Sequence, residues 1–493
     1  MIKVANLILL IILSPMVLAK HHIHYRISSV GNLVYQLDCI TQPAIFPCSS
    51  ADFSSLWTSE LAPNEKDKIM LERWHTLRKR FDKTVEYVNP PKLELLTSPN
   101  FPMNSSNGIN ILNQVRIMAF TSEDIDHYIS QLRLWLPIND VIEEQQIINH
   151  FWPRFESWFT QQQLTLNQFV IDAKKLSEEH DIDGLLTAMQ TFYQSDLPDD
   201  LILPVYLVAH PRKVAATSGL VFNENSVVEV LNGEKASNRL AVVIHEIAHF
   251  YHERASFDIL LNRMKYFFNE NSEVGKIGYY LFNEAMATAI GNGLLEQRMR
   301  SPEQFKKYQQ HPLSFYSDEG IDQAAKTALR LVSEQINNKR PIDIQFLAAL
   351  DESWAKGLHK IKNRPQQLLR HMGLIITEES YIELINELMG TIRPSMAQFN
   401  TPNGDNTEEQ SVTKQYPMMD TIILAKDWNQ IKVIDIPEFD NSKSNNETGV
   451  FVHKTSAGVY YVFIVTPDKP TVLKHVKEML EWPDFDAGHA LKT

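Results

Sequence analysis

The chain has 493 residues, of which 44% are hydrophobic and 22% are charged. This is the composition of a soluble globular protein, and the length exceeds what one ordinary core can organise, so we expect two or three domains. The net charge of −13 and the lack of a long basic cluster argue against a nucleic-acid partner.

The first nineteen residues have the pattern of a secretory signal peptide. Lys3 gives a positive start, Leu7 to Leu13 is apolar, and Val17-Leu18-Ala19 is a suitable cleavage site. The apolar run is shorter than the ~20 residues that a membrane-spanning helix needs. We therefore expect residues 1–19 to be removed near Ala19. The protein would then be exported to the periplasm or the medium, with no stable membrane anchor.

Residues 20–195 are expected to form a mostly helical amino-terminal region. Tyr25 to Ile40 has the pattern of a strand or hairpin interrupted at Gly31-Asn32. Apolar residues three and four positions apart predict helices within residues 51–85 and 121–193. The region is long enough to be either an inhibitory prosegment or a substrate-recognition domain.

Cys39 and Cys48 are the only two cysteines in the chain. In an oxidising compartment, two cysteines so close in the sequence are expected to form a small-loop disulfide. Neither cysteine lies near the histidine motif described below, so a thiolate metal ligand is not expected.

From Leu201 onward the pattern changes from helices to strands. Leu203 to Ala209 predicts one strand, and Gly219 to Phe222 with Ser226 to Leu231 predicts a hairpin or strand pair. These strands come directly before the segment with the strongest chemical signal in the chain.

That segment is an apolar helical run containing His245-Glu246-Ile247-Ala248-His249. Four residues are a little over one helical turn, so His245 and His249 project from one face and can bind the same Zn²⁺ ion. Glu246 then lies beside the metal, where its carboxylate can take a proton from water that the cation has acidified. The alternative is a structural helix whose two histidines only form hydrogen bonds in the core.

A third ligand is expected from the segment Phe282 to Thr288, which reads FNEAMAT and has helical period. Together the two motifs resemble those of gluzincin-type zinc metallopeptidases, in the peptidase MA clan. The resemblance covers residues 237–293. It implies one Zn²⁺ per chain and these roles: the ligands His245, His249 and Glu284, and the general base Glu246.

The chain departs from the gluzincin pattern at Thr288, where thermolysin-like members have an Asp that orients a ligand His. A hydroxyl is a weaker partner than a carboxylate, so ligand orientation is expected to depend on another group. His252, three residues after the second histidine, is expected at the surface rather than beside the site. The competing third ligands, which lack comparable Ala-rich flanks, are Glu253, Glu270 and Glu273.

Beyond Glu284 the periodicity predicts helices, which would complete a zincin-like catalytic domain over residues 196–399. By the resemblance, a Tyr or His from this half stabilises the oxyanion formed during hydrolysis. Tyr308, His311 and Tyr316 are the candidates by position. We rank Tyr316 first because it lies in a less regular, Pro-containing segment.

Residues 400–415 are polar and are expected to form a linker. Residues 416–493 then predict a small α/β module with short strands, including Ile431 to Ile436, and a final helix over Pro470 to Trp482. No phosphate-binding loop or catalytic cluster is evident in this module.

The sequence therefore predicts an α+β protein built around a zincin-like domain, with a helical amino-terminal region and a small carboxy-terminal α/β module. The expected function is that of an exported zinc metallopeptidase with a peptide or protein substrate. The alternative is a catalytically silent zinc-binding or interaction protein whose cleft is occluded.

Overall fold

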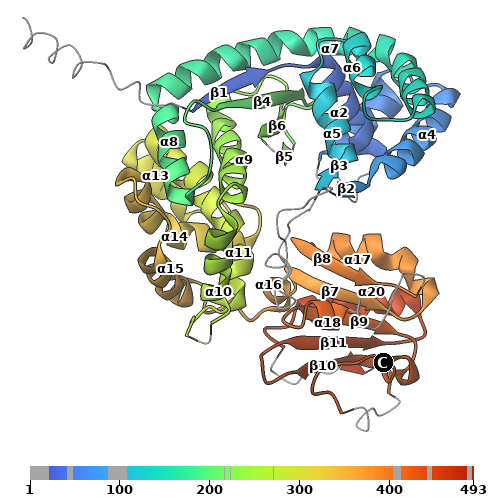
Figure 1. Cartoon of the computed structure of the whole chain (residues 1–493), viewed down its shortest axis with the longest axis vertical. Coiled ribbons are helices and arrows are strands. Elements are labelled where there is room, and N and C mark those ends of the chain that lie inside the picture. Colours follow the sequence, from blue (N-terminus) through green and yellow to red (C-terminus); the bar gives the residue numbers. More distant parts are fainter. Residues whose placement is uncertain are drawn as a thin grey trace, which may run out of the picture.

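The computed structural model describes residues 21–41, 48–86, 108–215, 217–222, 224–269, 271–402, 412–440, 447–485 and 491–492. The expected signal peptide lies outside these residues, as does most of the expected linker. Among the described residues, no helix combines the length and apolarity that a bilayer crossing needs. The chain is a mixture of helices with two small mixed sheets, as an α+β protein requires (Figure 1).

The first sheet has four strands, and it confirms the strands expected between Leu203 and Leu231. Its order is β1-β4-β6-β5, in which β1, β4 and β6 are parallel and the edge strand β5 is antiparallel to β6. The strands are β1 (His22–Arg26), β4 (Ile202–Ala209), β5 (Gly219–Phe222) and β6 (Asn225–Val230). All six residues of β6 are buried, as its central place in the sheet requires.

The hairpin expected for Tyr25 to Ile40 is wrong, because only β1 is a strand and helix α2 (Ser29–Thr41) follows it. Gly31 is not a turn residue: a Cβ there would come within 2.3 Å of the Phe120 ring, so glycine permits close helix packing. The Asn32 side chain donates to Leu207 O at 2.9 Å and accepts from Ala209 N at 2.8 Å, which joins α2 to β4. Gly31 and Asn32, which suggested a turn, therefore both form tertiary contacts within a helix.

Seven further helices and one short ribbon complete the amino-terminal region, as the periodicity predicts. The helices are α3 (Ser50–Ser55), a π-helix η1 (Leu56–Glu60), α4 (Glu65–Phe81), α5 (Ile111–Thr121), α6 (Ile125–Leu132), α7 (Ile138–Glu179) and α8 (Ile182–Tyr193), and the ribbon pairs β2 (Thr84–Glu86) with β3 (Gly108–Asn110). The expected disulfide joins Cys39 of α2 to Cys48, with 5.9 Å between the two Cα atoms.

A fully buried ion cluster ties these helices together. The Asp38 carboxylate accepts from Arg78 Nε at 2.7 Å, from Arg116 Nε at 2.8 Å and from Trp74 Nε1 at 2.8 Å. The guanidinium of Arg78 also forms two 3.0 Å bonds with Glu144 of α7. Two cations thus face two carboxylates, and removal of any one would leave an uncompensated buried charge.

The amino-terminal region shares its core with the first sheet. Strand β1 pairs along β4, α2 bonds to the same strand, and α7 also contacts it. His21, directly before β1, has hydrogen bonds to the Tyr251 hydroxyl and to Pro198 O. Such integration argues against the alternative in which residues 20–195 are an inhibitory prosegment, because their removal would uncover one edge and one face of the sheet.

The middle of the chain is helical, as expected. After a 3₁₀ turn η3 (Ala236–Asn238) come α9 (Leu240–Glu253), α10 (Phe257–Phe267), α11 (Lys276–Thr288), a π-helix η4 (Ala289–Leu295), α12 (Glu296–Met299), α13 (Pro302–Gln310), α14 (Glu319–Asn337), α15 (Ile344–Gly357) and α16 (Pro365–Leu368). Helix α10 lies in the chain between the two motifs.

The second sheet has six strands in the order β12-β10-β11-β9-β7-β8, and it forms the lower right lobe in Figure 1. The strands are β7 (His371–Ile376), β8 (Met396–Asn400), β9 (Asp420–Ala425), β10 (Gly449–Lys454), β11 (Tyr460–Val465) and β12 (Leu491–Lys492). The helices of this lobe are η5 (Glu379–Leu384), α17 (Ile385–Ile392), α18 (Val412–Gln415), α19 (Trp428–Ile431) and α20 (Lys469–Leu480).

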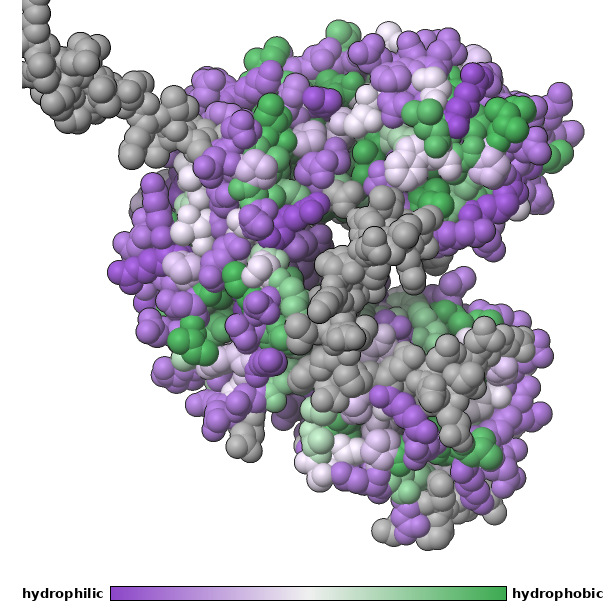
Figure 2. All heavy atoms as spheres, in the orientation of Figure 1, coloured by the Kyte–Doolittle hydropathy of each residue, from purple (hydrophilic) through white to green (hydrophobic). Residues whose placement is uncertain are grey.

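Two expectations about this lobe need correction. Ile431 to Ile436 is not a strand, because Asp427 caps the short helix α19 and the chain then turns. Strands β7 and β8 precede the expected linker, yet β7 pairs with β9 beyond it. The sheet therefore draws on both sides of residues 400–415 and does not begin at residue 416. Figure 2 shows a recess between this lobe and the amino-terminal helices.

Helix α11 contacts the second sheet through a part-buried ion pair. Lys276, the first residue of α11, lies 2.6 Å from Asp420 Oδ1 at the start of β9. The ring of Tyr280, one turn further along α11, stacks on the ring of His371 of β7, with 4.3 Å between centroids. Helix α11 therefore connects the second sheet to the region of the histidine motif.

Candidate metal centre

Helix α9 carries both histidines of the first motif, because its buried aliphatic face fixes the rotation of the helix. It packs against β5, β6 and the π-helix η4. This leaves His245 and His249 directed toward α11, with their side chains only 8% and 13% exposed. π-helical segments such as η4 are rare and are frequent near functional sites.

Glu284 of α11 completes a cluster of three side chains whose ligand atoms all lie within 4.8 Å of one another. The His245 and His249 Nε2 atoms are 3.0 Å apart, and each is 3.5 Å from a Glu284 carboxylate oxygen. In a tetrahedral zinc site with bonds of about 2.0–2.1 Å, neighbouring ligand atoms are about 3.3 Å apart. The observed separations agree with that geometry.

The hydrogen bond of His249 Nδ1, the ring nitrogen further from Glu284, determines which nitrogen of this ring directs a lone pair at the cluster. His249 Nδ1 lies 3.0 Å from Asn283 Oδ1, and because an amide oxygen only accepts, Nδ1 must carry the proton. His249 Nε2 then points a lone pair at His245 Nε2. Two ring nitrogens and a carboxylate converging in this way call for a cation or a proton between them.

The hydrogen bond that orients His245 is weak, as expected from the threonine that replaces an aspartate at position 288. Thr288 Oγ1 lies 3.5 Å from His245 Nδ1, at the limit of a hydrogen bond. The ring of His245 is also held by Tyr316, which stacks on it with 5.9 Å between centroids and 21° between planes. Stacking on Tyr316 therefore holds the orientation of the His245 ring, which the threonine hydroxyl alone does not hold.

The carboxylate of Glu284 has the properties of a metal ligand. Its Oε2 atom is buried and has no hydrogen-bond partner among the described residues. Burial acts to raise the pKa of Glu284, but the adjacent His249 and His245 outweigh it and lower the pKa to about 2. An ionised carboxylate directed at two imidazole nitrogens fits a site that holds Zn²⁺.

Glu246 lies beside the cluster on the same helix, against the edge strand β5. A Cβ built on Gly219 would come within 2.4 Å of Glu246 Oε1, so only glycine leaves room for this carboxylate. Burial raises the pKa of Glu246 to about 7, and the charge of Glu284 acts in the same direction. Such a carboxyl is suited to exchanging protons near neutral pH.

Of the three oxyanion candidates, the structure brings only Tyr316 to the cluster. Burial raises the pKa of its phenol, as do the charges of Glu284 and Glu246, so the hydroxyl keeps its proton. Tyr308 instead stacks on Phe315. His311 is exposed, with Nδ1 2.7 Å from Pro312 O.

The surface position expected for His252 is wrong. Its ring lies between those of Tyr193 and Phe282, and its Nδ1 is 3.4 Å from Arg263 Nη1. Neither Glu253 nor Glu273 belongs to the cluster of candidate ligands. Glu270 lies outside the described residues.

Two residues that shape this site, Asn283 and Gly219, were not predicted from the sequence. Asn283 directly precedes Glu284, so its place in the second motif is a signal that could have identified it as a partner of His249. Gly219 carries no such signal, because its contact with Glu246 depends on how β5 approaches α9.

Comparison with known protein families, curated proteins and solved structures finds no match to this chain. The function must therefore be inferred from the site itself.

Proposed function

We propose that this protein is a zinc-dependent peptidase of gluzincin type. The observation that carries the proposal is the convergence of two imidazole nitrogens and one half-buried carboxylate at separations suited to tetrahedral zinc. The proposed ligands are His245, His249 and Glu284. Zinc bound there would lower the pKa of a water molecule and polarise the carbonyl of a peptide bond.

The remaining chemistry belongs to side chains around the cluster. Glu246 receives the proton of the attacking water and passes it to the leaving amine. Tyr316, with its proton held on by burial and negative surroundings, donates a hydrogen bond to the oxygen on which charge develops. Asn283 holds the His249 ring in the tautomer that directs Nε2 to the centre.

The substrate is proposed to be a peptide bound along strand β5. This strand pairs with β6 on one side only and forms the edge of the described sheet nearest Glu246. An extended peptide can add to such an edge through main-chain hydrogen bonds. The scissile carbonyl would then lie beside the glutamate.

We also propose that the peptidase acts outside the cytoplasm. Support comes from the signal-peptide pattern of residues 1–19 and from the Cys39–Cys48 disulfide, since disulfides persist in oxidising compartments.

The deciding experiment combines metal analysis with hydrolysis of a mixture of fluorescence-quenched peptides. The wild type should hold about one zinc per chain, and Glu284→Ala should lose it. Glu246→Gln should keep the zinc and lose nearly all turnover. The control is Glu253→Gln, an exposed glutamate of the same helix, which should behave as the wild type.

Other outcomes would replace the proposal. Bound zinc without hydrolysis in the wild type would indicate a catalytically silent zinc-binding protein with an occluded cleft. Full turnover in Glu246→Gln would reject this general base. Absence of zinc from wild type after refolding with the metal would leave the two histidines with a structural role only.

A further inference from the structure

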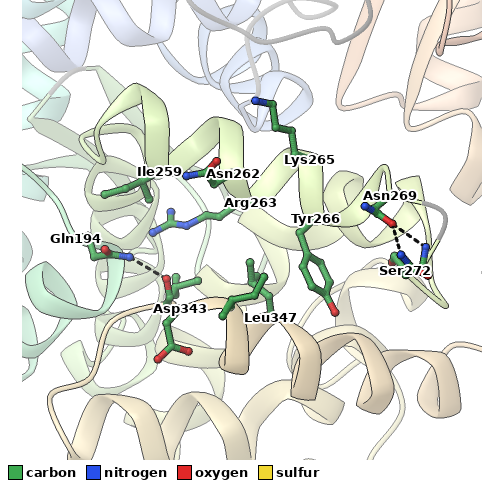
Figure 3. A pocket seen from close by; sticks show the side chains of 13 residues that line it. Gln194, Ile259, Asn262, Arg263, Lys265, Tyr266, Asn269, Ser272, Asp343 and Leu347 are labelled. Carbon is green, nitrogen blue, oxygen red and sulfur yellow. Dashed lines mark hydrogen bonds between the residues drawn. The ribbon is translucent and has the colours of Figure 1, made fainter.

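A cavity separate from the proposed metal ligands lies between α10 and the start of α15. Its volume is about 620 Å³, within the range of about 300–1,000 Å³ typical of small-molecule sites (Figure 3). Aliphatic side chains, including Ile259, Ile342 and Leu347, form part of the wall. The amides Asn262 and Asn269 contribute polar groups.

Arg263 is the one buried cation that lines this cavity, and only 3% of it is exposed. Its Nη2 donates to Tyr193 O at 2.7 Å, and its Nη1 lies 3.4 Å from His252 Nδ1. Its Nε has no hydrogen-bond partner among the described residues. The Tyr193 hydroxyl, also buried, likewise has no hydrogen-bond partner there.

No carboxylate of the described residues forms an ion pair with Arg263 within 4.0 Å. Burial lowers the pKa of Arg263 to about 10, so the guanidinium remains charged at neutral pH. A buried charge without a counter-ion is costly, and a buried donor without an acceptor adds to that cost. An anion that entered the cavity beside Arg263 would supply the missing counter-ion.

The described lining has two other charged residues, Asp343 and Lys265, and neither forms an ion pair with Arg263. Asp343 caps α15, accepting from Phe346 N at 2.8 Å. Figure 3 shows the Lys265 side chain directed away from Arg263, on the other side of α10. The charged side chains of the described lining are thus two cations and one carboxylate, and Arg263 is the buried one.

We propose that this cavity binds a small organic carboxylate with a branched apolar body. A carboxylate can accept two parallel hydrogen bonds from a guanidinium. The aliphatic wall would then cover the hydrocarbon part, which a free inorganic anion lacks. The site does not depend on zinc or on hydrolysis.

The position of Arg263 also relates this cavity to the proposed metal centre. Its Nη1 contacts His252, which lies on α9 three residues after His249. Its guanidinium carbon lies 5.9 Å from the centre of the Phe282 ring, on α11 two residues before Glu284. A ligand on Arg263 would therefore contact a side chain that touches both helices of the centre.

The test is calorimetric titration of the mature protein with isocaproate, its uncharged amide isocaproamide, and inorganic phosphate. We expect the carboxylate to bind at least about tenfold more tightly than the amide or phosphate, since hydrogen bonds to charged groups are the stronger ones. Arg263→Gln should abolish this preference, and Lys265→Gln should retain it.

Two further variants keep the test decisive. Ile344 lines the cavity and is 63% exposed, so substitutions there should leave the fold intact. Ile344→Glu should weaken carboxylate binding by charge repulsion. Ile344→Gln, which adds no charge, should leave carboxylate binding unchanged. Because carboxylates also bind zinc, the titration is repeated with Glu284→Ala, in which this binding should persist. Equal binding of acid and amide, no binding at millimolar concentration, or loss only in Glu284→Ala would overturn the proposal without bearing on the peptidase proposal.

Discussion

Replacement of Gly219 by Ala tests whether the placement of Glu246 controls turnover. The added Cβ would come within 2.4 Å of Glu246 Oε1, whereas ordinary contacts begin at 3.4 Å, so the carboxylate must move by about 1 Å. The obstructing atoms belong to the end of a flexible side chain, so the fold should tolerate the change. A misplacement of about 1 Å at a reacting group can cost about 100-fold in rate.

The assay measures zinc content and kcat on the same preparation, with a fluorescence-quenched peptide cleaved by the wild type. We expect Gly219→Ala to retain its zinc and to lose about 100-fold in kcat. The control is Gly390→Ala, because no atom lies within 4 Å of a Cβ built there. Turnover within about twofold of wild type, with zinc bound, would refute the link between this close contact and the rate.

Three further predictions concern the supports of the fold and the site. Asn283→Ala should weaken zinc binding about 10- to 100-fold, measured by competition with a chelator, because it frees a ligand ring. Asp38→Asn should lower the free energy of unfolding by about 3–5 kcal/mol in urea titrations, whereas the more exposed Asp140→Asn should change it little. Burial acts to raise the pKa of Asp67, but hydrogen bonds from Arg154 and its neighbours lower it to about 2. The extra stability of the wild type over Asp67→Asn should therefore be present above about pH 4 and be lost as the pH falls toward 2; an unchanged difference would contradict this.

The integration of residues 20–195 affects how the protein can be studied. Strand β1, helix α2 and the buried Asp38 cluster belong to the same core as the first sheet. Fragments that begin after residue 195 would expose β4 along one edge, and an exposed strand edge favours aggregation. Full-length mature protein is therefore the material for the experiments above.

The sequence by itself was sufficient to predict features that depend on local geometry. Helical spacing placed His245 and His249 on one face, and the second motif identified Glu284 as their neighbour. The strands from Leu203 to Leu231 and the disulfide also followed from local pattern and spacing. Apart from Glu284, which the resemblance of the second motif indicated, each of these depends on residues close in the sequence, where backbone periodicity limits the possible arrangements.

Other features were decided by tertiary structure, because they depend on which distant segment occupies a given face. Gly31 and Asn32 suggest a turn, but close packing against Phe120 and hydrogen bonds to β4 make them part of a helix. His252 is half-buried because Tyr193, Phe282 and Arg263 of α10 lie against it. Strand β7 joins β9 across the expected linker because sheet neighbours are chosen by hydrogen bonding and burial, which local periodicity does not record. The contact of Gly219 with Glu246 has the same origin, since it arises only when β5 lies against α9.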